Sequence, residues 1–454
     1  MKYLPFLIKI IRSVTVYYRI QYNKMINNKF FKLGRKNFAD VFRGSENRRY
    51  GDKSLIDQFI TLENKSRKSR FFYDKIKKKF SIFSKIFFLT KNLKSRKNRM
   101  TINRIKKKIY LLEKKTFLLE KLKTETLSLI GNLIHNSGVF LKSENKSRIF
   151  IWKFFKIYCN NLYNHVDLLR MIGGVDYKRG SLVSGQRGYF LKSPGIIINL
   201  AILRYGLDFL MKRDFVPLQT PLFMDKKKIK KCCQLNDFEE QLYVIGKNGR
   251  KFLIATSEQP MSSFHSEEKF ELQQLPLKYA GFSSCFRKES GSHGKDTLGI
   301  FRVHHFEKIE QFVISQSSKS WLVFEEMLKN AHDFYSSLNL PFISIEIPSG
   351  SINNTASKKI DLLGWFPFGK THRELVSCSN CTDFQSRDMK IFQNSSKKGK
   401  TDNFVHLLNS TLCASSRTIC CLLENYQNPS GILIPNVLKS YIGISFVPFL
   451  QRYT

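Results

Sequence analysis

The chain has 454 residues, and because a domain usually holds about 100 to 200 residues, two or three domains are expected. Its 42% hydrophobic and 25% charged residues lie close to globular averages, which excludes wholesale disorder. Its 77 Lys and Arg against 36 Asp and Glu leave a net charge of +41, so the favoured partner is a polyanion such as RNA or DNA.

Cysteine usage and hydropathy narrow the class of protein further. The nine cysteines follow no regular pattern and include two adjacent pairs, Cys232–Cys233 and Cys420–Cys421. Such a set argues against a secreted disulfide scaffold and favours a reducing compartment. No apolar run approaches the roughly 18 residues that cross a bilayer, so we expect a soluble protein with no membrane contact.

Residues 1–25 are set apart as an N-terminal extension. They contain no acidic residue and mix Leu, Ile and Tyr with Lys and Arg, but a clean cleavage site is missing. The segment is compatible with a targeting peptide and with a plain extension, and Met25 is an alternative start.

Residues 26–165 are predicted to form a basic domain built on an antiparallel helical hairpin. Within residues 52–131, apolar side chains recur at steps of three and four, first from Tyr73 to Phe87 and then from Ile102 to Leu119. Residues 1–165 hold 40 Lys and Arg against 10 Asp and Glu, which suits a partner that supplies phosphates. The alternative is that these lysines only form a solvated helix face.

Residues 166–454 are predicted to form a second domain of the α+β class. Helices are expected at 196–212 and 321–338, and β-rich runs at 215–224, 252–256, 277–286 and 309–314. Because no helix alternates with each strand, the pattern favours a mostly antiparallel sheet flanked by helices.

The segment from Cys285 to Phe312 carries the most chemistry. It is predicted to be a strand that ends at Arg287–Lys288–Glu289, a polar loop through Gly291, Gly294 and Gly299, and a return strand from Phe301. Arg287 offers a rigid fork for a phosphate, Glu289 can accept from an amine, and Phe306 presents a flat face to a base. Each residue also has a structural alternative, an ion pair for the charged ones and core packing for Phe306.

Three further segments contain candidate site residues: TSEQP at 256–260, RELVSCSNCTDFQSR at 373–387 and LNSTLCASSRTICCLLENYQ at 408–427. The last is predicted to be a small-residue turn that opens into a helix. Arg417 lies near the start of this helix, where backbone N–H groups already favour an anion, so it is a second candidate phosphate ligand.

The spacing Cys378-x-x-Cys381 raises the question of zinc. No second pair follows at 15 to 20 residues, so we expect both cysteines to pack in the interior and zinc to be absent.

Taken in order, these segments resemble the class II aminoacyl-tRNA synthetases, specifically the seryl-tRNA synthetases of the eukaryotic cytosolic type. VPLQTPLFM resembles motif 1, residues 286–312 resemble motif 2, and CASSRTICCLLENYQ resembles motif 3. The similarity covers about residues 160–450, whereas the N-terminal third matches only in its pattern of a long helical hairpin.

The resemblance implies ATP-dependent ligation of L-serine to tRNA(Ser) through seryl-adenylate. It implies a cytoplasmic homodimer that uses Mg²⁺ and joins through the motif 1 region, with the hairpin reaching the long variable arm of tRNA(Ser) and other contacts at the acceptor end. The Lys- and Asn-rich composition leaves an organelle or another compartment with a reduced genome as an alternative location.

The resemblance also assigns roles to individual residues. Arg287, Glu289 and Arg417 are implied to be catalytic, and Glu374 and Ser377 to carry Mg²⁺ through ATP. The implied ATP-binding residues are Arg287, Lys288, Glu289, Val303, His304, His305, Phe306, Glu374, Leu375, Val376, Ser377 and Arg417. The implied serine-binding residues are Thr256, Ser257, Glu258, Arg287, Glu310, Asn409 and Thr411.

The sequence departs from the family pattern at a few positions. Lys295 and Leu298 stand where the motif 2 loop usually has arginines, and Leu363 stands where the family commonly has a carboxylate. The implied catalytic residues are untouched, so we expect an active enzyme. The alternative is a catalytically inactive RNA-binding protein on a synthetase scaffold.

Overall fold

The computed structural model describes residues 36–89, 96–142, 148–151, 162–232, 241–246, 249–289, 298–394 and 403–450. The N-terminal extension predicted at 1–25, Cys233 and motif 2 loop residues Gly291, Gly294 and Lys295 lie outside these ranges. No helix in the described ranges is long and apolar enough to cross a membrane.

The chain divides into two compact units between Leu133 and Ile134. This division comes earlier than the predicted boundary between residues 165 and 166. The reason is that Ile134 packs in one apolar cluster with Ile343 and Ile345 of the second unit, so the chain joins that unit as soon as the hairpin ends.

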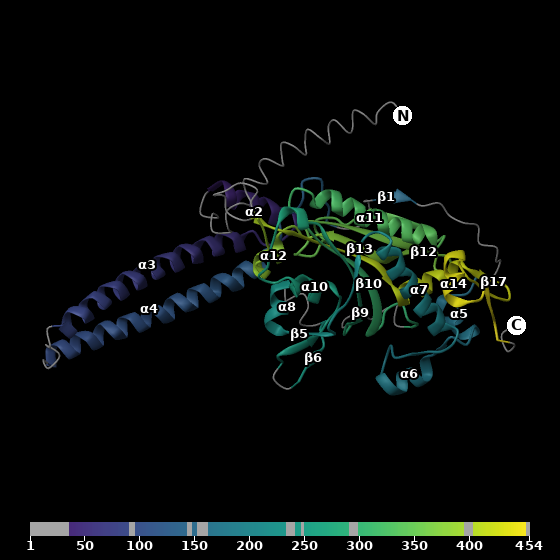
Figure 1. The fold of residues 1–454 in the computed structure, drawn as a ribbon, viewed down its shortest axis with the longest axis horizontal. Coiled ribbons are helices and arrows are strands. Elements are labelled where there is room, and N and C mark those ends of the chain that lie inside the picture. The colour runs from purple at the N-terminus through teal and green to yellow at the C-terminus, as the bar shows by residue number, and fades with distance from the viewer. Residues whose placement is uncertain are drawn as a thin grey trace, which may run out of the picture. The chain divides into compact units, whose positions relative to one another are not determined.

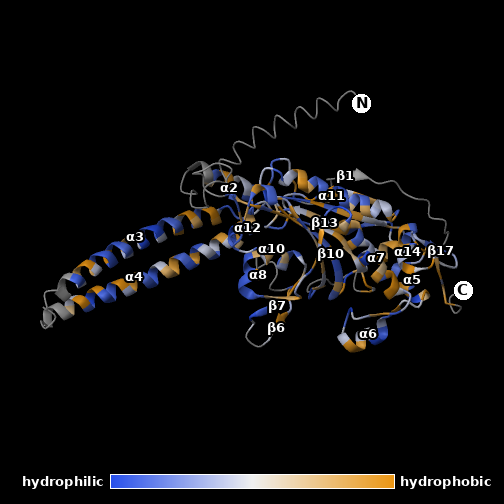
Figure 2. Ribbon diagram, viewed as in Figure 1, coloured by the Kyte–Doolittle hydropathy of each residue, from blue (hydrophilic) through white to orange (hydrophobic). Residues whose placement is uncertain are grey.

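The first unit contains the predicted helical hairpin. Helix α3 spans Ser54–Leu89 and α4 spans Arg96–Leu129. In Figure 2 apolar and polar turns alternate along both helices, as expected for helices that share one seam. A helix that was not predicted, α2 (Lys36–Arg48), precedes them, and its Ala39 and Phe42 pack with Ile56, Phe59 and Ile130 at the base of the hairpin.

The middle of the seam is held by polar pairs. The hydroxyl oxygens of Ser69 and Thr116 lie 2.8 Å apart in a buried contact. The Lys123 ammonium lies 3.1 Å from the Glu63 carboxylate, in an ion pair whose side chains are 17% and 9% exposed. These contacts fix the register between α3 and α4 and leave most lysines of the hairpin on its outer faces.

The second unit is built on an eight-stranded sheet. Its strands run in the order β1 (Arg148–Ile151), β11 (Phe342–Glu346), β12 (Lys358–Phe366), β13 (Thr371–Asn380), β16 (His406–Ala414), β10 (His305–Ser315), β9 (Leu277–Phe286) and β4 (Val216–Gln219). The edge strand β4 runs parallel to β9, and every other neighbouring pair is antiparallel. The predicted α+β class II fold is confirmed.

Helices cover the two faces of this sheet through separate apolar cores. The core with Val313 of β10 also contains residues of α7 (Gly195–Met211), α11 (Ser320–Ser337) and α13 (Ser415–Asn425). The core with Phe312 and Ile314 contains residues of α8 (Lys226–Cys232), α10 (Glu258–Phe264) and α12 (Phe384–Met389). Alternate residues of β10 therefore face opposite cores, and Figure 1 shows α11 and α8 on opposite sides of the sheet.

Smaller elements complete the second unit. A three-stranded sheet of β5 (Phe223–Asp225), β7 (Lys251–Leu253) and β6 (Val244–Ile245) adjoins α8. The others are α5 (His165–Met171), β2 (Val175–Asp176), α6 (Tyr177–Ser184), β3 (Phe190–Leu191), β8 (Lys269–Phe270), β14 (Phe392–Gln393), β15 (Asn403–Phe404), β17 (Gln427–Asn428), β18 (Gly431–Leu433), α14 (Lys439–Ile442) and β19 (Phe446–Pro448).

Three predicted boundaries were wrong for local reasons. The motif 1 segment forms two strands in different sheets, β4 and β5, because Pro221 lies between them and cannot donate to a sheet. The return strand of motif 2 begins at His305, since residues 298–302 bend and turn Phe301 and Val303 inward. The residues just before α13 form β16 instead of a turn.

Candidate active site

A pocket opens on the face of the sheet that carries Glu310 and Thr411, which lie opposite each other on β10 and β16. It collects side chains from segments that are far apart in the sequence: the end of β9, residues 301–308, β13, β16 and the start of α13. The lining residues are Arg287, Glu289, Phe301, Arg302, Val303, Phe306, Lys308, Glu374, Leu375, Thr411, Ala414, Ser416 and Arg417.

The two predicted phosphate ligands, Arg287 and Arg417, both line this pocket. Arg287 directly follows β9, its guanidinium carbon lies 5.3 Å from the centre of the Phe306 ring, and its Nε donates to the Ala255 carbonyl at 3.4 Å. Arg417 is in the first turn of α13 and lies 5.0 Å from the centre of the Phe301 ring. Each arginine is therefore held against an aromatic face while the pocket stays positively charged.

Glu289 also lines the pocket, and its carboxylate forms an ion pair with Arg302. Its side chain is only 8% exposed, and its backbone has a φ of 48°, a left-handed conformation that non-glycine residues rarely adopt. The preceding Lys288 N–H donates to the Gln241 carbonyl at 2.8 Å, which holds this part of the backbone beside residue 241. The Arg302 guanidinium therefore orients the Glu289 carboxylate in the pocket lining.

Glu374 contributes a carboxylate to the floor of the pocket. Arg417 donates from Nη1 to the Glu374 carbonyl at 3.1 Å and approaches its carboxylate Oε1 at 3.3 Å. Desolvation alone would raise the pKa of Glu374, but the charges of Arg417, Lys359 and Arg287 outweigh it and lower the pKa. Glu374 therefore remains an anion among cations.

Ser377 lies on the same strand and pairs across the sheet with Asp361 of β12. The Asp361 carboxyl is buried, its Oδ2 lies 3.3 Å from the Lys359 ammonium, and its Oδ1 has no hydrogen-bond partner among the residues that the structure describes. Burial is the main cause that raises the pKa of Asp361, to about 7. Asp361 was not predicted as a site residue.

The remaining predicted ATP-binding residues occupy varied positions. Val303 and Leu375 line the pocket, whereas the Val376 side chain is buried in the core on the other face, so only its backbone can serve a ligand. His304 donates from Nδ1 to the Arg287 carbonyl at 3.0 Å, and the exposed His305 ring stacks on Phe286. His304 therefore contacts the backbone of a residue that lines the pocket, whereas His305 packs beside the end of β9.

The predicted serine side of the pocket contains a buried ion pair between Lys308 and Glu310, whose side chains are 7% and 3% exposed. Thr256 Oγ1 donates to the Glu310 carboxylate at 3.2 Å and accepts from the Lys308 ammonium at 2.7 Å. Thr411 Oγ1 lies 3.5 Å from the same ammonium. The arrangement presents a carboxylate, an ammonium and two hydroxyls, which together complement a small zwitterion with a hydroxyl.

Three other predicted serine-binding residues surround this group. Glu258, at the start of α10, accepts from the Gln385 amide at 2.8 Å, and burial followed by repulsion from Glu310 raises its pKa to about 7. The Asn409 amide donates to Cys381 Sγ at 3.5 Å. The Ser257 side chain is fully buried and faces Gly281 of β9. Of the predicted serine-binding residues, Arg287 and Thr411 line the pocket, whereas Thr256, Ser257, Glu258, Glu310 and Asn409 are not among the lining residues. Both Cys378 and Cys381 are buried free thiols.

Five residues that line the pocket were not predicted from the sequence: Phe301, Arg302, Lys308, Ala414 and Ser416. The two cations among them are Lys308 and Arg302. Both form ion pairs with predicted carboxylates, Glu310 and Glu289. A signal was present for Lys308, because it lies two positions before Glu310 on a strand and hence faces the same side. A carboxylate buried on a strand also needs a cation nearby. For Arg302 the sequence offers no comparable signal, since it precedes the strand in a bend.

The surroundings of Leu363 explain how leucine is accommodated where the family commonly has a carboxylate. Leu363 lies opposite Glu374 in the β12–β13 ladder and packs against an apolar cluster that contains Ile134, Ile343 and Ile345. Leucine thus extends an apolar surface beside the pocket and removes one negative charge near Glu374.

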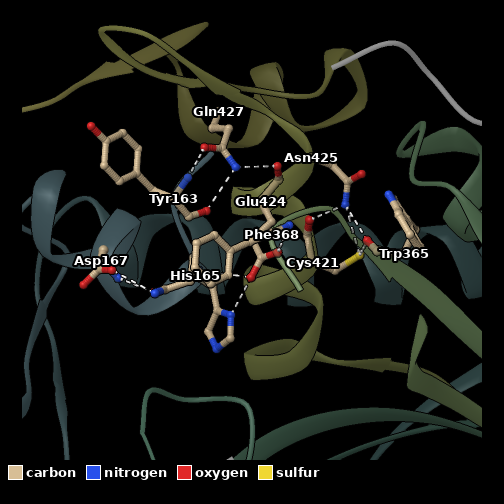
Figure 3. Close-up of polar contacts among 10 residues, drawn as sticks. Tyr163, His165, Asp167, Trp365, Phe368, Cys421, Glu424, Asn425 and Gln427 are labelled. Atoms are coloured by element: carbon tan, nitrogen blue, oxygen red, sulfur yellow. Dashed lines mark hydrogen bonds and ion pairs between the residues drawn. The ribbon is translucent and has the colours of Figure 1, made fainter. Parts of the chain in front are cut away.

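A buried polar network supports the helix that carries Arg417 (Figure 3). His165 of α5 contacts the Glu424 carboxylate through Nδ1 at 2.8 Å and donates its backbone N–H to the same oxygen at 3.2 Å. The Phe368 N–H donates to the other carboxylate oxygen at 3.2 Å. Burial alone would lower the pKa of His165, but Cys420 and Glu424 outweigh it and raise the pKa to about 10.

Comparisons with known proteins place these features in a family. The model of the tRNA synthetase class II core domain (G, H, P, S and T) matches residues 243–426. The chain is 44% identical to the cytoplasmic serine–tRNA ligase of Arabidopsis thaliana, over 94% of this chain and 97% of that protein. It is 42% identical to the serine–tRNA ligase of Helianthus annuus, over 94% and 99%.

Solved structures agree in fold over nearly the whole chain. The cytoplasmic serine–tRNA ligase of Naegleria fowleri in complex with AMP superposes with a TM-score of 0.81 at 40% identity, covering 93% of this chain and 99% of that one. The seryl-tRNA synthetase of Pyrococcus horikoshii complexed with ATP gives a TM-score of 0.82 at 30% identity, covering 92% and 98%.

Proposed function

The chain belongs to the seryl-tRNA synthetases, the serine–tRNA ligases of class II, and joins L-serine to tRNA(Ser) using ATP. We propose that both steps of this reaction, formation of seryl-adenylate and transfer of serine to the tRNA, occur in the pocket that Arg287 and Arg417 line. The observation that carries this proposal is the convergence of these two arginines on one cavity that adjoins the Lys308–Glu310 pair. The inactive alternative finds no support, because the relatives that match nearly the whole chain are serine–tRNA ligases.

In the first step, the serine carboxylate attacks the α-phosphorus of ATP, and pyrophosphate leaves with the electron pair of the broken P–O bond. Arg287 stabilises the charge that develops on the α-phosphate, and Arg417 binds the γ-phosphate of the departing group. Phe306 stacks on adenine and Glu289 accepts from its exocyclic amine. Alignment and charge stabilisation supply the rate acceleration, so no side-chain nucleophile is needed.

In the second step, the terminal ribose hydroxyl of the tRNA attacks the serine carbonyl carbon of seryl-adenylate. AMP leaves, and the seryl ester of the tRNA forms. The cleft must therefore admit the 3′ end of the tRNA from its open side while seryl-adenylate remains bound.

Specificity for serine follows from the polar group around Glu310. Glu310 binds the ammonium and the hydroxyl of serine together with Thr256, Asn409 and Thr411, and Lys308 balances its charge. Alanine is rejected because it would leave buried polar groups without a partner. Threonine is rejected only by a steric clash of its methyl group and is therefore the stronger competitor.

We propose that Mg²⁺ binds together with ATP beside Glu374, which lines the pocket. Glu374 and Ser377 would offer hard oxygen ligands, and the buried Asp361 carboxyl, whose pKa is raised to about 7, lies opposite Ser377 in the sheet. In the described part of the chain no three His, Cys, Asp or Glu side chains gather into a metal site, so phosphate oxygens would supply the remaining ligands. The ion supplies charge neutralisation for the pyrophosphate that leaves.

The enzymatic proposal is tested by serine-dependent exchange of pyrophosphate into ATP and by charging of a tRNA pool. We expect exchange with serine, none with alanine, weak exchange with threonine at most, and seryl-tRNA(Ser) as the charged product. EDTA should abolish exchange, and excess MgCl₂ should restore it. An enzyme that binds tRNA but exchanges no pyrophosphate with any of the three amino acids would refute the proposal.

A homodimer is proposed through the motif 1 region. The edge strand β4 leaves one side unpaired in the described sheet, and α7 beside it exposes a row of apolar side chains. These exposed residues are Ile196, Ile197, Leu200, Met211 and, on β4, Val216.

Sedimentation equilibrium checks this interface. The unmodified chain should sediment with twice the monomer mass, and Leu200→Glu should shift it to the monomer because a buried, unpaired carboxylate is costly. Leu322→Glu, at an exposed apolar residue of α11, is the matched control and should leave the dimer intact. A monomeric unmodified chain would contradict the proposal.

A further inference from the structure

Helix α8 presents a lysine cluster beside the serine side of the pocket. Between Asp225 and Lys251 the sequence has eight Lys and Arg against four Asp and Glu. The helix buries Ile229 and Cys232 in the core that it shares with α10 and α12. Its lysines are thereby turned outward, and Lys227, Lys228 and Lys230 are exposed.

The charge of this cluster is largely uncompensated. Lys227, Lys228 and Lys230 form no ion pair with any residue of the described ranges. Asp388 interacts electrostatically with Lys231, at the end of the helix. Arg250, just before strand β7, and Lys251, its first residue, lie close to α8, because the Lys226 N–H donates to the Arg250 carbonyl at 2.7 Å. These two residues extend the positive surface.

Hydrogen bonds connect α8 directly to the catalytic groups. The Gln385 amide donates to the Cys232 carbonyl at 2.9 Å and to the Glu258 carboxylate at 2.8 Å, so one side chain bridges the end of α8 and the serine pocket. The small sheet next to α8 is tied to the strand that ends in Arg287, because the Phe286 N–H donates to the Ile254 carbonyl at 2.8 Å. The lysine cluster therefore belongs to a helix whose last residue is joined through Gln385 to the predicted serine-binding residue Glu258.

We propose that Lys227, Lys228 and Lys230 of α8 bind backbone phosphates at the acceptor end of the tRNA while its terminal ribose reaches seryl-adenylate. This inference rests on the proposed function, because the RNA end must enter the pocket. The three lysines span about 4.5 Å along the helix axis, and their long, flexible side chains can reach neighbouring phosphates of one strand. Lysines that contact phosphates contribute affinity without reading sequence.

The first test uses the full-length variant Lys227→Gln/Lys228→Gln/Lys230→Gln. Serine-dependent pyrophosphate exchange should stay within about twofold, whereas kcat/KM for tRNA(Ser) should fall roughly tenfold or more. The plot of log kcat/KM against log salt concentration should become less steep by about 2 to 3, the slope expected for three lost phosphate contacts. Unchanged kcat/KM together with an unchanged salt slope would overturn the proposal.

The matched control is Lys319→Gln/Lys329→Gln/Lys439→Gln, three exposed lysines of the same unit. Lys329 belongs to α11, Lys319 immediately precedes that helix, and Lys439 belongs to α14. These elements pack on the face of the sheet opposite α8, so we expect charging and its salt slope to be unchanged. Equal losses in both variants would show that only net charge matters and would also overturn the proposal.

A second measurement does not depend on a variant that folds. In the unmodified enzyme, tRNA(Ser) should protect Lys227, Lys228 and Lys230 from acetylation, as read by mass spectrometry, and leave Lys439 reactive. Equal labelling with and without tRNA would refute the contact. Loss of exchange in the unmodified enzyme would instead refute the proposed function, so the two failures are distinguishable.

Discussion

Replacement of Arg287 by Ala is expected to reduce serine-dependent pyrophosphate exchange by about three orders of magnitude or more. Arg287 is the cation that faces the α-phosphate in our proposal, and it also contacts the backbone at Ala255, which directly precedes the serine-binding segment. Loss of one preorganised donor to a developing charge typically costs about 10²- to 10³-fold, and loss of a full charge costs more. Exchange of labelled pyrophosphate into ATP measures the effect.

The control for this variant is Arg287→Lys, which keeps the charge but replaces a planar fork by a point charge. It should recover part of the activity. Binding of tRNA(Ser) should be unaffected by either change, because the hairpin and α8 are untouched. If Arg287→Ala retains normal exchange, the assignment of this arginine to the α-phosphate is wrong.

Shortening the hairpin is expected to separate the two activities of the enzyme. Residues 66–119 can be replaced by a short turn, because Ser69 faces Thr116 and the helices are antiparallel neighbours. The base cluster of Ile56, Phe59 and Ile130 remains. We expect exchange to stay within about twofold, whereas kcat/KM for charging tRNA(Ser) should fall by roughly 10³-fold or more, as expected when several phosphate contacts are lost.

Charge is the reason for this expectation. The removed segment holds nineteen Lys and Arg against two Asp and Glu. A full-length control, Lys106→Gln/Lys107→Gln/Lys108→Gln, should give an intermediate loss that becomes smaller as the salt concentration rises, because the variant makes fewer phosphate contacts. If the shortened enzyme loses exchange as well, the division of labour between the two units is wrong. If it still charges tRNA(Ser) normally, the hairpin is not the recognition arm.

The fold was predictable wherever one segment carries its own periodic signal. The long helices α3, α4, α7 and α11 follow from apolar spacing, and β9 from a run of β-rich residues. Helix α2 could not be predicted, because its Ala39 and Phe42 become a core only when Ile56 and Ile130 arrive from other segments. The division between Leu133 and Ile134 differs from the predicted boundary for the same reason: Ile134 packs against Ile343 and Ile345, which lie about two hundred residues further along the chain.

The part of the site that could be predicted from the sequence is the part in which the residue type itself indicates the ligand. Arg287 and Arg417 stand out because few residues bind phosphates and because their segments resemble a family pattern. The pairing of Lys308 with Glu310 and Thr256 depends on strand register and on the approach of a separate loop. Such contacts have no local signature. The role of α8 was also hidden, because a lysine run becomes informative only when its position beside the pocket is known.

The network around Glu424 has a consequence for the order in which the protein is made. The Tyr163 N–H donates to Gln427 at 2.8 Å, and the two positions are 264 residues apart in the sequence. At about 5 to 20 residues per second, a ribosome needs roughly 13 to 50 s to cover that distance. No nascent chain that ends before residue 427 can contain all of these bonds. The helix that holds Arg417 therefore acquires this support only after residues 424–427 have been synthesised.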